Sequence, residues 1–551
     1  MNRSPHQLFT AALILTAAGG CGDDTGSAAD TGTTTAGQET TGDPDTTSNA
    51  DDGTTGQGTT AADDTTSGDG SSTGEPLSRL ELIEEALFTA MFLCPDRAWP
   101  EVADNMRTSQ IMLVSVQNGE AYLWNDQHSG AESPGLTEVD FASLGAEWHS
   151  TFEFGVYNDV RTLGISLDVT AELNAEFEKA GVPQWHDYAL GLTFHEGMHY
   201  LSGQSGWNVN PGSRSLPYPE PWEPRYFRAQ MGWALRGELE DGTVDFGTAA
   251  FWREAAFDAF PNDMNAIASY DITEGSAEYG SAMMSALAAL GCDATDEELV
   301  DAVVEHLDSY ASLSHYSGGR EPYDLGVLTG LSLQRVGADG WQGVVEDGTT
   351  MQQVLLSQFD PEAAPDDADV QASAQEAVNA RNEVAAERIE PMLLDMADPS
   401  FYRLPVPPNW IQGSFSPGAF YYLADEPGEP DLWLSYSALH ETPSGTVLDV
   451  QELTSLLGIA NPCAVGQGTI VLLIPAAEAT DNGDGTFTSS NTQVAFEDLT
   501  AMVIEDENAL PWLCPEQSAA PPAPSHGLST YDAKTEIAES LRGRPILLPH
   551  H

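Results

Sequence analysis

Apolar residues recur along this chain in two periods, which predict helices in some segments and strands in others. In residues 185–203, Tyr188, Leu192, His195 and His199 form one stripe at the spacing i, i+4, i+7 and i+11. Further apolar residues beside this stripe indicate a helix buried on more than one side. Alternating apolar residues from Leu163 to Val169 predict a strand shortly before this helix. Residues 369–396 have the pattern of a long helix that closes the first folded unit.

Capping and turn signals mark where the folded body begins. Ser78 is followed three residues later by Glu81, the spacing of a capping box, which predicts a helix. Downstream, residues 111–116 and 121–124 have the composition of strands and flank an Asn-Gly dipeptide, which is typical of type I′ turns. We therefore expect a β-hairpin at this point.

Composition divides the chain into four parts. Residues 1–21 combine a basic start, a short apolar run and a final Ala-Gly-Gly-Cys, which resembles a bacterial lipoprotein signal. Cys21 would then be lipidated in the cell envelope, with plain secretion as the alternative. Residues 22–76 contain no aromatic and no basic residue and should form a flexible acidic tether. A first domain is predicted at 77–398 and a small β-rich domain at 400–551.

The acidity of the chain excludes one class of partner. Its formal net charge is −67 at pH 7, from 86 acidic and 19 basic residues. So acidic a surface repels nucleic acid and anionic lipid, so we expect no nucleic-acid partner and no membrane contact except through the lipid anchor. Adaptation to salt and weak Ca²⁺ binding both fit this charge, but residues 481–485 lack the acid spacing of an EF-hand and predict a hairpin turn. The sequence does not determine the oligomeric state.

The cysteine content is typical of a chain outside the cytosol. Beyond Cys21, an even number remains, which predicts two disulfides, with free structural thiols as the alternative: Cys94, Cys292, Cys463 and Cys514. The pairing cannot be deduced from spacing. We expect Cys463 to pair with Cys514 because both lie in the predicted β-rich domain.

The sequence His195-Glu196-Gly197-Met198-His199 carries the clearest chemical signal. Two imidazoles four residues apart fall on one face of a helix and can bind a single metal ion, with Glu196 directed toward the open side of that ion. Zinc chemistry needs this arrangement, together with a third ligand from elsewhere and a water between the metal and a base. The alternative is a pair of ordinary, hydrogen-bonded core histidines.

The motif and a downstream Glu-Gly-Ser-Ala-Glu-Tyr sequence that starts at Glu274 together resemble the gluzincins, the thermolysin-like zinc metallopeptidases. The resemblance implies an α+β fold whose zincin-like catalytic domain has a small mixed sheet followed by a helical lobe. It also implies that His195, His199 and Glu274 bind Zn²⁺ and that Glu196 is the general base. Glu278 stands where the family has an aspartate that orients a ligand histidine. The alternatives are a helix N-terminal glutamate at 274 and a solvated helix-face glutamate at 278.

The resemblance extends to substrate binding. In that family the strand nearest the metal holds the substrate backbone by edge pairing, and residues 163–169 would be that strand here. Hydrogen-bond donors to the transition state come from the region after the third ligand. In this chain that region offers Tyr279, His315, Tyr316, Arg320 and Tyr323.

Three arginines are notable in so acidic a chain. Arg214, Arg225 and Arg228 belong to an insertion at 204–262 that is rich in aromatic residues and proline and separates the motif from Glu274. They could bind a substrate carboxylate or neutralise nearby acidic side chains, and the sequence leaves both interpretations open.

Together these features predict a secreted, lipid-anchored zinc metallopeptidase that acts on protein or peptide substrates. Zinc would acidify a water molecule, and Glu196 would accept its proton during attack on the peptide carbonyl. Two alternatives remain. One is another zinc-dependent hydrolase on the same scaffold, and the other is a non-catalytic surface binding protein whose zinc is structural.

Overall fold

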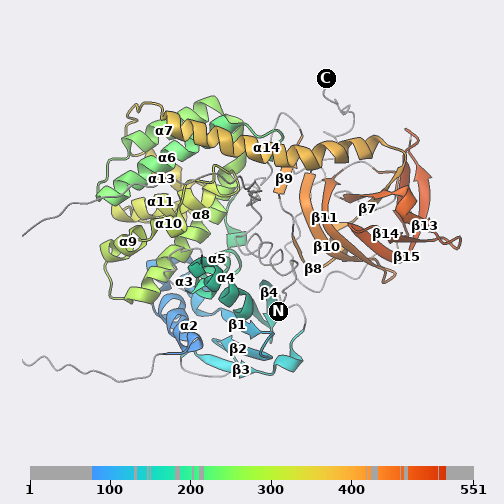
Figure 1. The fold of residues 1–551 in the computed structure, drawn as a ribbon. Helices are drawn as coiled ribbons and strands as arrows, with labels where there is room; N and C mark the ends of the chain where they lie inside the picture. Colours follow the sequence, from blue (N-terminus) through green and yellow to red (C-terminus); the bar gives the residue numbers. More distant parts are fainter. Residues whose placement is uncertain are drawn as a thin grey trace, which may run out of the picture.

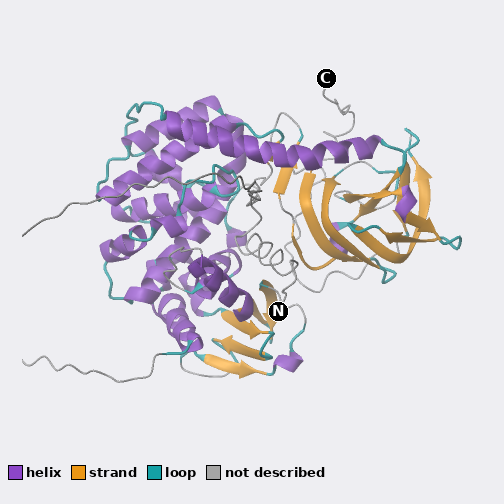
Figure 2. Cartoon of the chain, viewed as in Figure 1, coloured by secondary structure: helices purple, strands orange, loops and turns teal. Residues whose placement is uncertain are grey.

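The computed structural model, drawn in Figure 1, describes residues 77–516. Gaps in this range fall at residues 129–132, 146–147, 149–150, 180–186, 202–203, 210–215, 417–418, 424–431, 459–460, 464–468 and 507. The predictions for residues 1–21 and 22–76, for lipidation at Cys21 and for Arg214 lie outside the described residues. Within them, helices are combined with two mixed sheets, as the predicted α+β class requires (Figure 2).

The described chain begins with the predicted capping box, which is confirmed. The backbone N–H of Ser78 donates to Glu81 Oε2 at 2.7 Å, and Ser78 Oγ accepts from the Glu81 N–H at 3.3 Å. This exchange satisfies free donors at the start of helix α2 (Arg79–Leu87). A π-helical turn, Phe88–Leu93, continues the helix to Cys94.

The predicted β-hairpin is confirmed, but its turn differs from the prediction. Strand β1 (Gln110–Ser115) pairs antiparallel with β2 (Glu120–Trp124). Of the loop residues 116–119, only Gly119 has a positive φ, whereas a type I′ turn needs two such residues. The hairpin belongs to a five-stranded sheet of order β3-β2-β1-β5-β4, whose other members are β3 (Leu136–Val139), β4 (Phe152–Tyr157) and β5 (Val160–Ser166).

The prediction of a strand at residues 163–169 that lies at the sheet edge is wrong in two respects: the strand ends earlier, and it is not an edge strand. β5 ends at Ser166, whose hydroxyl accepts a hydrogen bond from the Val169 N–H at 3.2 Å at the start of α4 (Leu167–Lys179). The apolar alternation misled here because a short run does not separate the end of a strand from the first turn of a helix. β5 pairs parallel with β1 and antiparallel with β4, so it is an inner strand, and β4 forms the edge of the sheet on that side.

Helix α5 (Tyr188–Tyr200), which carries the histidine motif, packs on β5 and on the long helix α8 (Pro261–Leu290). The stretch expected as an insertion contributes α6 (Trp222–Asp241) and α7 (Gly247–Ala259) to the same helical lobe (Figure 1). The lobe also contains α9 (Asp296–Val304), α10 (Leu307–Tyr310), α11 (Glu321–Arg335), α12 (Trp341–Glu346) and α13 (Met351–Leu356).

Helices α8 and α11 approach each other backbone to backbone through glycines. A Cβ on Gly326 would lie 2.2 Å from the Cα of Gly275, and a Cβ on Gly330 would lie 2.2 Å from Cδ2 of Tyr279. Both separations are far inside van der Waals contact. Side chains at these positions would therefore force the two helices apart.

We predict that Gly326→Ala destabilises the protein by about 1–3 kcal/mol, because the added methyl group overpacks the α8–α11 crossing. The matched control is Gly237→Ala on α6, where no atom lies within 4 Å of the new Cβ. That substitution should raise the stability by up to about 1 kcal/mol through helix propensity. Urea unfolding curves of the three proteins provide the comparison, and equal effects of the two substitutions would contradict the close crossing.

One long helix leads from the helical lobe to the second sheet, as Figure 1 shows. It was predicted at 369–396 and is confirmed as α14 (Ala368–Ala397). The helix packs on α6, and its residues Ala385, Ile389 and Met392 enter an apolar core shared with the sheet. Neither α14 nor any other described helix combines the length and the apolar content needed to cross a membrane.

The C-terminal part is β-rich, as predicted. Its sheet includes one short strand from the helical lobe, β6 (Leu216–Pro217), which lies just before α6. β6 pairs parallel with β9 (Ala419–Tyr422). β11 pairs with β10, β12 and β15, so the path β11-β12-β7-β16-β15 closes into a ring. Residues 481–485 connect two antiparallel strands as the expected hairpin. The other strands are β7 (Phe401–Val406), β8 (Ile411–Ser416), β10 (Leu432–Glu441), β11 (Val447–Leu457), β12 (Ile470–Pro475), β13 (Ala479–Asp481), β14 (Thr486–Ser490), β15 (Val494–Glu505) and β16 (Pro511–Pro515).

The described residues contain two disulfides, and the predicted pairing of Cys463 with Cys514 is confirmed. This bond joins β16 to the connection between β11 and β12. The other bond, between Cys94 and Cys292, joins the π-helical turn after α2 to the C-terminal end of α8. Each disulfide therefore links segments that are distant in sequence within one part of the fold.

His440, on β10, is completely buried. Its Nε2 lies 2.8 Å from Tyr436 Oη, and its Nδ1 has no hydrogen-bond partner among the described residues. Burial lowers the pKa of His440 from 6.5 to about 4, because the charged imidazolium is poorly solvated there. Between these two values the unfolded chain binds a proton that the folded state does not, so stability falls as the pH decreases through this window.

We predict that the wild type loses about 3 kcal/mol of unfolding free energy between pH 7 and pH 4 relative to His440→Gln. Glutamine keeps a polar group near Tyr436 but does not titrate. Urea unfolding at both pH values measures the difference. The same pH dependence in both proteins would show that His440 is protonated equally in the folded and unfolded states.

Candidate metal centre

An aspartate fixes the start of α5 and thereby the direction of its histidines. Asp187 Oδ1 accepts from the Ala189 N–H at 2.8 Å, and Arg79 holds the same carboxylate through Nε and Nη2 at 2.5 and 2.8 Å. The helix then continues without proline for 13 residues. Because side chains four positions apart share a helix face, His195 and His199 lie together on the side that faces α8.

Glu274 completes a group that could hold a metal ion. It lies in the middle of α8, so the alternative of a helix N-terminal glutamate does not apply. The Nε2 atoms of His195 and His199 are 3.2 Å apart, and they lie 3.4 and 3.1 Å from Glu274 Oε2. His195 and Glu274 are buried. Three converging donor atoms in a water-poor site are stable when a cation is shared among them, so the donor set fits a metal ion.

The other nitrogen of each imidazole faces an acceptor oxygen. His195 Nδ1 lies 2.9 Å from Glu278 Oε2, and His199 Nδ1 lies 2.6 Å from Gln204 Oε1. Because each oxygen accepts a hydrogen bond, each Nδ1 carries a proton, and each Nε2 then points toward Glu274. Metal-binding histidines are oriented in this way, and the contact rules out a solvated helix-face role for Glu278.

The sequence reasoning did not identify Gln204. Its amide oxygen accepts from His199, and its Nε2 donates to the carbonyl of Thr273 at 2.8 Å, next to Glu274. Gln204 therefore ties the turn after α5 to the helix that carries the third donor. A lone glutamine has no distinctive sequence signal, because its role depends on the 3₁₀ turn Gln204–Gly206 lying against α8.

The start of α11 forms another wall of the site. The ring of Tyr323 stacks on His195 with centroids 5.6 Å apart and planes at 9°. The Arg320 guanidinium lies over the Tyr323 ring at 5.0 Å, with Nη2 3.9 Å from Glu278 Oε1. Burial raises the pKa of Glu278, but the hydrogen bond from His195 and the charge of Arg320 outweigh burial and lower it. Glu278 is therefore ionised at neutral pH.

The carboxylates around the imidazoles favour a positive charge in the site. Burial alone lowers the pKa of His195, but hydrogen bonds to Glu274 and Glu278 raise it to about 10. A metal ion would take the place of that proton between the same donors. Burial raises the pKa of Glu196, and the two histidines oppose this only in part. A buried glutamate of raised pKa beside a metal-binding group is suited to accept a proton near neutral pH.

The candidate transition-state donors lie in different surroundings. Tyr279 is fully buried between Trp99 and Trp341, at centroid distances of 6.3 and 5.3 Å, so it is a core residue and not a donor at the site. Its position, one residue past Glu278, turns it to another face of α8. Tyr316 is also buried, and His315 is exposed. The remaining two candidates lie at the start of α11: Tyr323 stacks on His195, and Arg320 approaches Glu278, the partner of that histidine.

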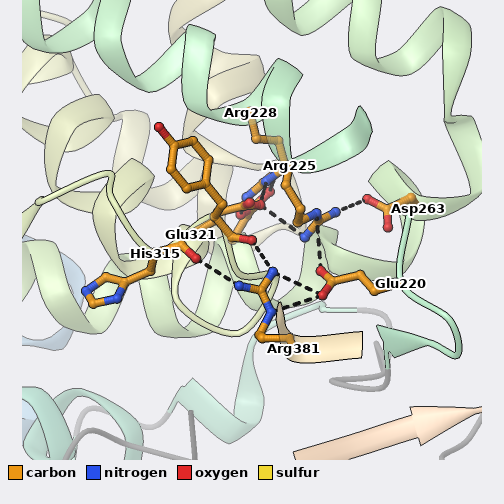
Figure 3. Close-up of polar contacts among 9 residues, drawn as sticks. Glu220, Arg225, Arg228, Asp263, His315, Glu321 and Arg381 are labelled. Carbon is orange, nitrogen blue, oxygen red and sulfur yellow. Dashed lines mark hydrogen bonds and ion pairs between the residues drawn. The ribbon is translucent and has the colours of Figure 1, made fainter. Parts of the chain in front are cut away.

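Two of the arginines considered for substrate binding are buried in ion pairs. Arg228 binds Asp271 at 2.5 and 3.0 Å and Glu321 at 2.7 Å. Arg225 binds Asp263 and lies 3.1 Å from Glu321, as Figure 3 shows. Their side chains are 3 % and 1 % exposed, so they neutralise buried carboxylates and do not reach a substrate.

Comparisons of this chain with protein-family models, with curated proteins and with solved structures find no match. The chemistry of the site is therefore inferred from the residues and distances described above.

We predict that His199→Ala and Glu274→Ala abolish metal binding, because each removes one of the three donors. Gln204→Leu keeps the donors but frees the His199 ring, and it should weaken metal affinity by roughly 10–100-fold. The control is His315→Ala, which removes an exposed imidazole. Elemental analysis and titration against a chelator provide the measurements. Retention of the metal in both donor variants would contradict this ligand set.

Proposed function

We propose that the His195, His199 and Glu274 group binds zinc and that the protein is a zinc metallopeptidase of gluzincin type. The convergence of these three donors carries the proposal. Donor atoms about 2.0–2.1 Å from a tetrahedral zinc ion lie about 3.3 Å from one another. The separations of 3.1, 3.2 and 3.4 Å between the side-chain atoms fit that geometry.

The surrounding residues have the properties that peptide hydrolysis needs. Zinc bound there would acidify water and polarise a carbonyl group. Glu196 takes the proton from the attacking water and passes it to the leaving amine, and its raised pKa suits both transfers. Glu278 and Gln204 keep the imidazoles in place. Arg320, whose Nη2 lies 3.9 Å from Glu278 Oε1, is the cation that we propose stabilises the negative charge developing on the carbonyl oxygen.

The edge strand β4 is the proposed platform for an extended substrate. It ends the order of the first sheet and lies against the residue that follows His199. That residue, Tyr200, donates its hydroxyl to the carbonyl of Gly155 at 2.7 Å and stacks on Phe154 at 4.8 Å. A peptide paired with β4 would run past the metal-binding group, bound by main-chain hydrogen bonds. We therefore transfer the substrate-pairing role from residues 163–169 to β4.

The disulfides support a location outside the cytosol, where such bonds persist. Lipid anchoring through Cys21 stays a prediction, since that residue lies outside the described part of the chain.

Three protein donors favour an enzyme over a binding protein with structural zinc. Structural zinc sites close with four protein ligands, whereas catalytic sites keep one position for water or substrate. Among the described residues, the metal-binding group consists of His195, His199 and Glu274. Another hydrolase on the same scaffold is distinguished from a peptidase by assays with peptide, ester and amide substrates.

We predict that Glu196→Gln lowers peptide hydrolysis by roughly 10²–10⁴-fold, because the amide cannot accept the proton of water. Metal content should stay at the wild-type level, since Glu196 is not among the three donors. Glu387→Gln, at an exposed position of α14, is the matched control and should keep full activity. Turnover by Glu196→Gln at the wild-type rate would rule out this mechanism.

A further inference from the structure

A buried charge cluster lies where the helical lobe meets α14 (Figure 3). Its members come from α6, α8, α11, α14 and the segment before α6: Glu220, Arg225, Arg228, Asp263, Asp271, Glu321 and Arg381. The cluster thus contains four carboxylates and three guanidinium groups. Removal of one partner leaves a buried charge without compensation, so the cluster resists rearrangement of the elements that supply it.

Arg381 connects this cluster to the backbone that leads into α11. Its Nη1 donates to the carbonyl of His315 at 3.0 Å, and its Nη2 donates to the carbonyl of Tyr316. Nε and Nη2 also lie 3.2 and 3.1 Å from Glu220 Oε2. The planar guanidinium group can bind these acceptors together, which a lysine ammonium cannot do with the same geometry.

The segment held by Arg381, residues 311–320, has a strained backbone. Leu313 and Tyr316 have φ values of 54° and 47°, in the left-handed region, which costs about 1–3 kcal/mol for a residue other than glycine. The Leu313 N–H donates to Asp324 Oδ2 at 3.2 Å. Such conformations persist where surrounding contacts impose them, and Arg381 and Asp324 supply such contacts from two different helices.

The same segment delivers two side chains to the candidate metal centre. It ends at Arg320, which lies 3.9 Å from Glu278, and the first turn of α11 carries Tyr323, which stacks on His195. Glu321, between the two, is bound into the charge cluster by an arginine of α6 at 2.7 Å. A shift of the segment would therefore move both side chains relative to the metal-binding group.

Helix α14, which carries Arg381, is held both by the helical lobe and by the second sheet. Asn382 accepts a hydrogen bond from the Glu220 N–H at 2.8 Å and donates one to the Glu220 carbonyl at 2.9 Å. One turn farther along, Ala385 and then Ile389 enter the apolar core that α14 shares with the second sheet. The position of Arg381 is thus set by the helical lobe and by the β-rich part together.

We propose that Arg381 is a positioning residue for the candidate metal centre, through which α14 and the β-rich part hold residues 311–323 against the metal-binding group. The kinetic consequence of this proposal rests on the proposed peptidase function, whereas the structural consequence does not. The β-rich part then acts as a scaffold for the site.

The test compares wild type, Arg381→Met, Arg381→Lys and a matched control, Arg388→Met, at an exposed position of the same helix. Each full-length protein is assayed for metal content, for kcat and KM on internally quenched peptides, and for hydrogen exchange by mass spectrometry. We expect Arg381→Met to lower kcat by roughly 10–100-fold with little change in KM or metal content. Exchange should accelerate in residues 311–323, with an intermediate effect in Arg381→Lys and none in Arg388→Met.

Three results would overturn the proposal: unchanged kcat and exchange in Arg381→Met, loss of the metal, or faster exchange throughout the protein. The last two would identify Arg381 as a general structural residue. A wild type that binds metal but cleaves no peptide would count against the proposed function alone. In that case, exchange in residues 311–323 decides whether Arg381 positions the segment.

Discussion

The contact between α8 and α11 at Gly275 and Gly326 sets the dimensions of the candidate metal centre. Because neither residue has a side chain, the two backbones touch, and Tyr323, one turn before Gly326, reaches the imidazole of His195. Glu274 immediately precedes Gly275, so the same contact fixes the distance between the third donor and the aromatic wall. A Cβ on Gly326 would lie 2.2 Å from the Cα of Gly275, so a larger residue at the crossing would push α8 and α11 apart and move Tyr323 relative to His195.

The charges at the site balance when a divalent cation is included. Glu196, Glu274 and Glu278 contribute three negative charges when ionised, and Arg320 contributes one positive charge. A dication brings the sum to zero when Asp324, which lies 3.6 Å from Arg320 and whose pKa is raised by burial to about 7, is protonated. Uncompensated charge in such a buried place costs several kcal/mol. This balance explains why the two histidines have different hydrogen-bond partners: His195 faces the carboxylate of Glu278, whereas His199 faces the neutral amide of Gln204. A second supporting carboxylate would leave the site with excess negative charge.

The confirmed sequence predictions depend on neighbouring residues. The capping box at Ser78 and the long helix α14 follow from the types of residues that lie a few positions apart in the sequence. The pairing of Cys514 with Cys463 was predicted because both cysteines lie in the same β-rich region. The two motif histidines also share one local helix, whereas Glu274 was found through a family resemblance. The contact of Gln204 with α8, the edge position of β4 and the burial of Arg228 arise from tertiary packing between distant segments. No local pattern encodes such contacts, so the sequence alone did not reveal them.

The disulfide between Cys94 and Cys292 closes a covalent loop around all the donors of the candidate site. These cysteines are 198 positions apart, and His195, His199 and Glu274 lie between them. A single break in the backbone anywhere in that span leaves the two pieces joined through sulfur. For a protein proposed to cleave peptide bonds, one autoproteolytic cleavage between Cys94 and Cys292 therefore leaves the three donor residues in a single covalently linked molecule.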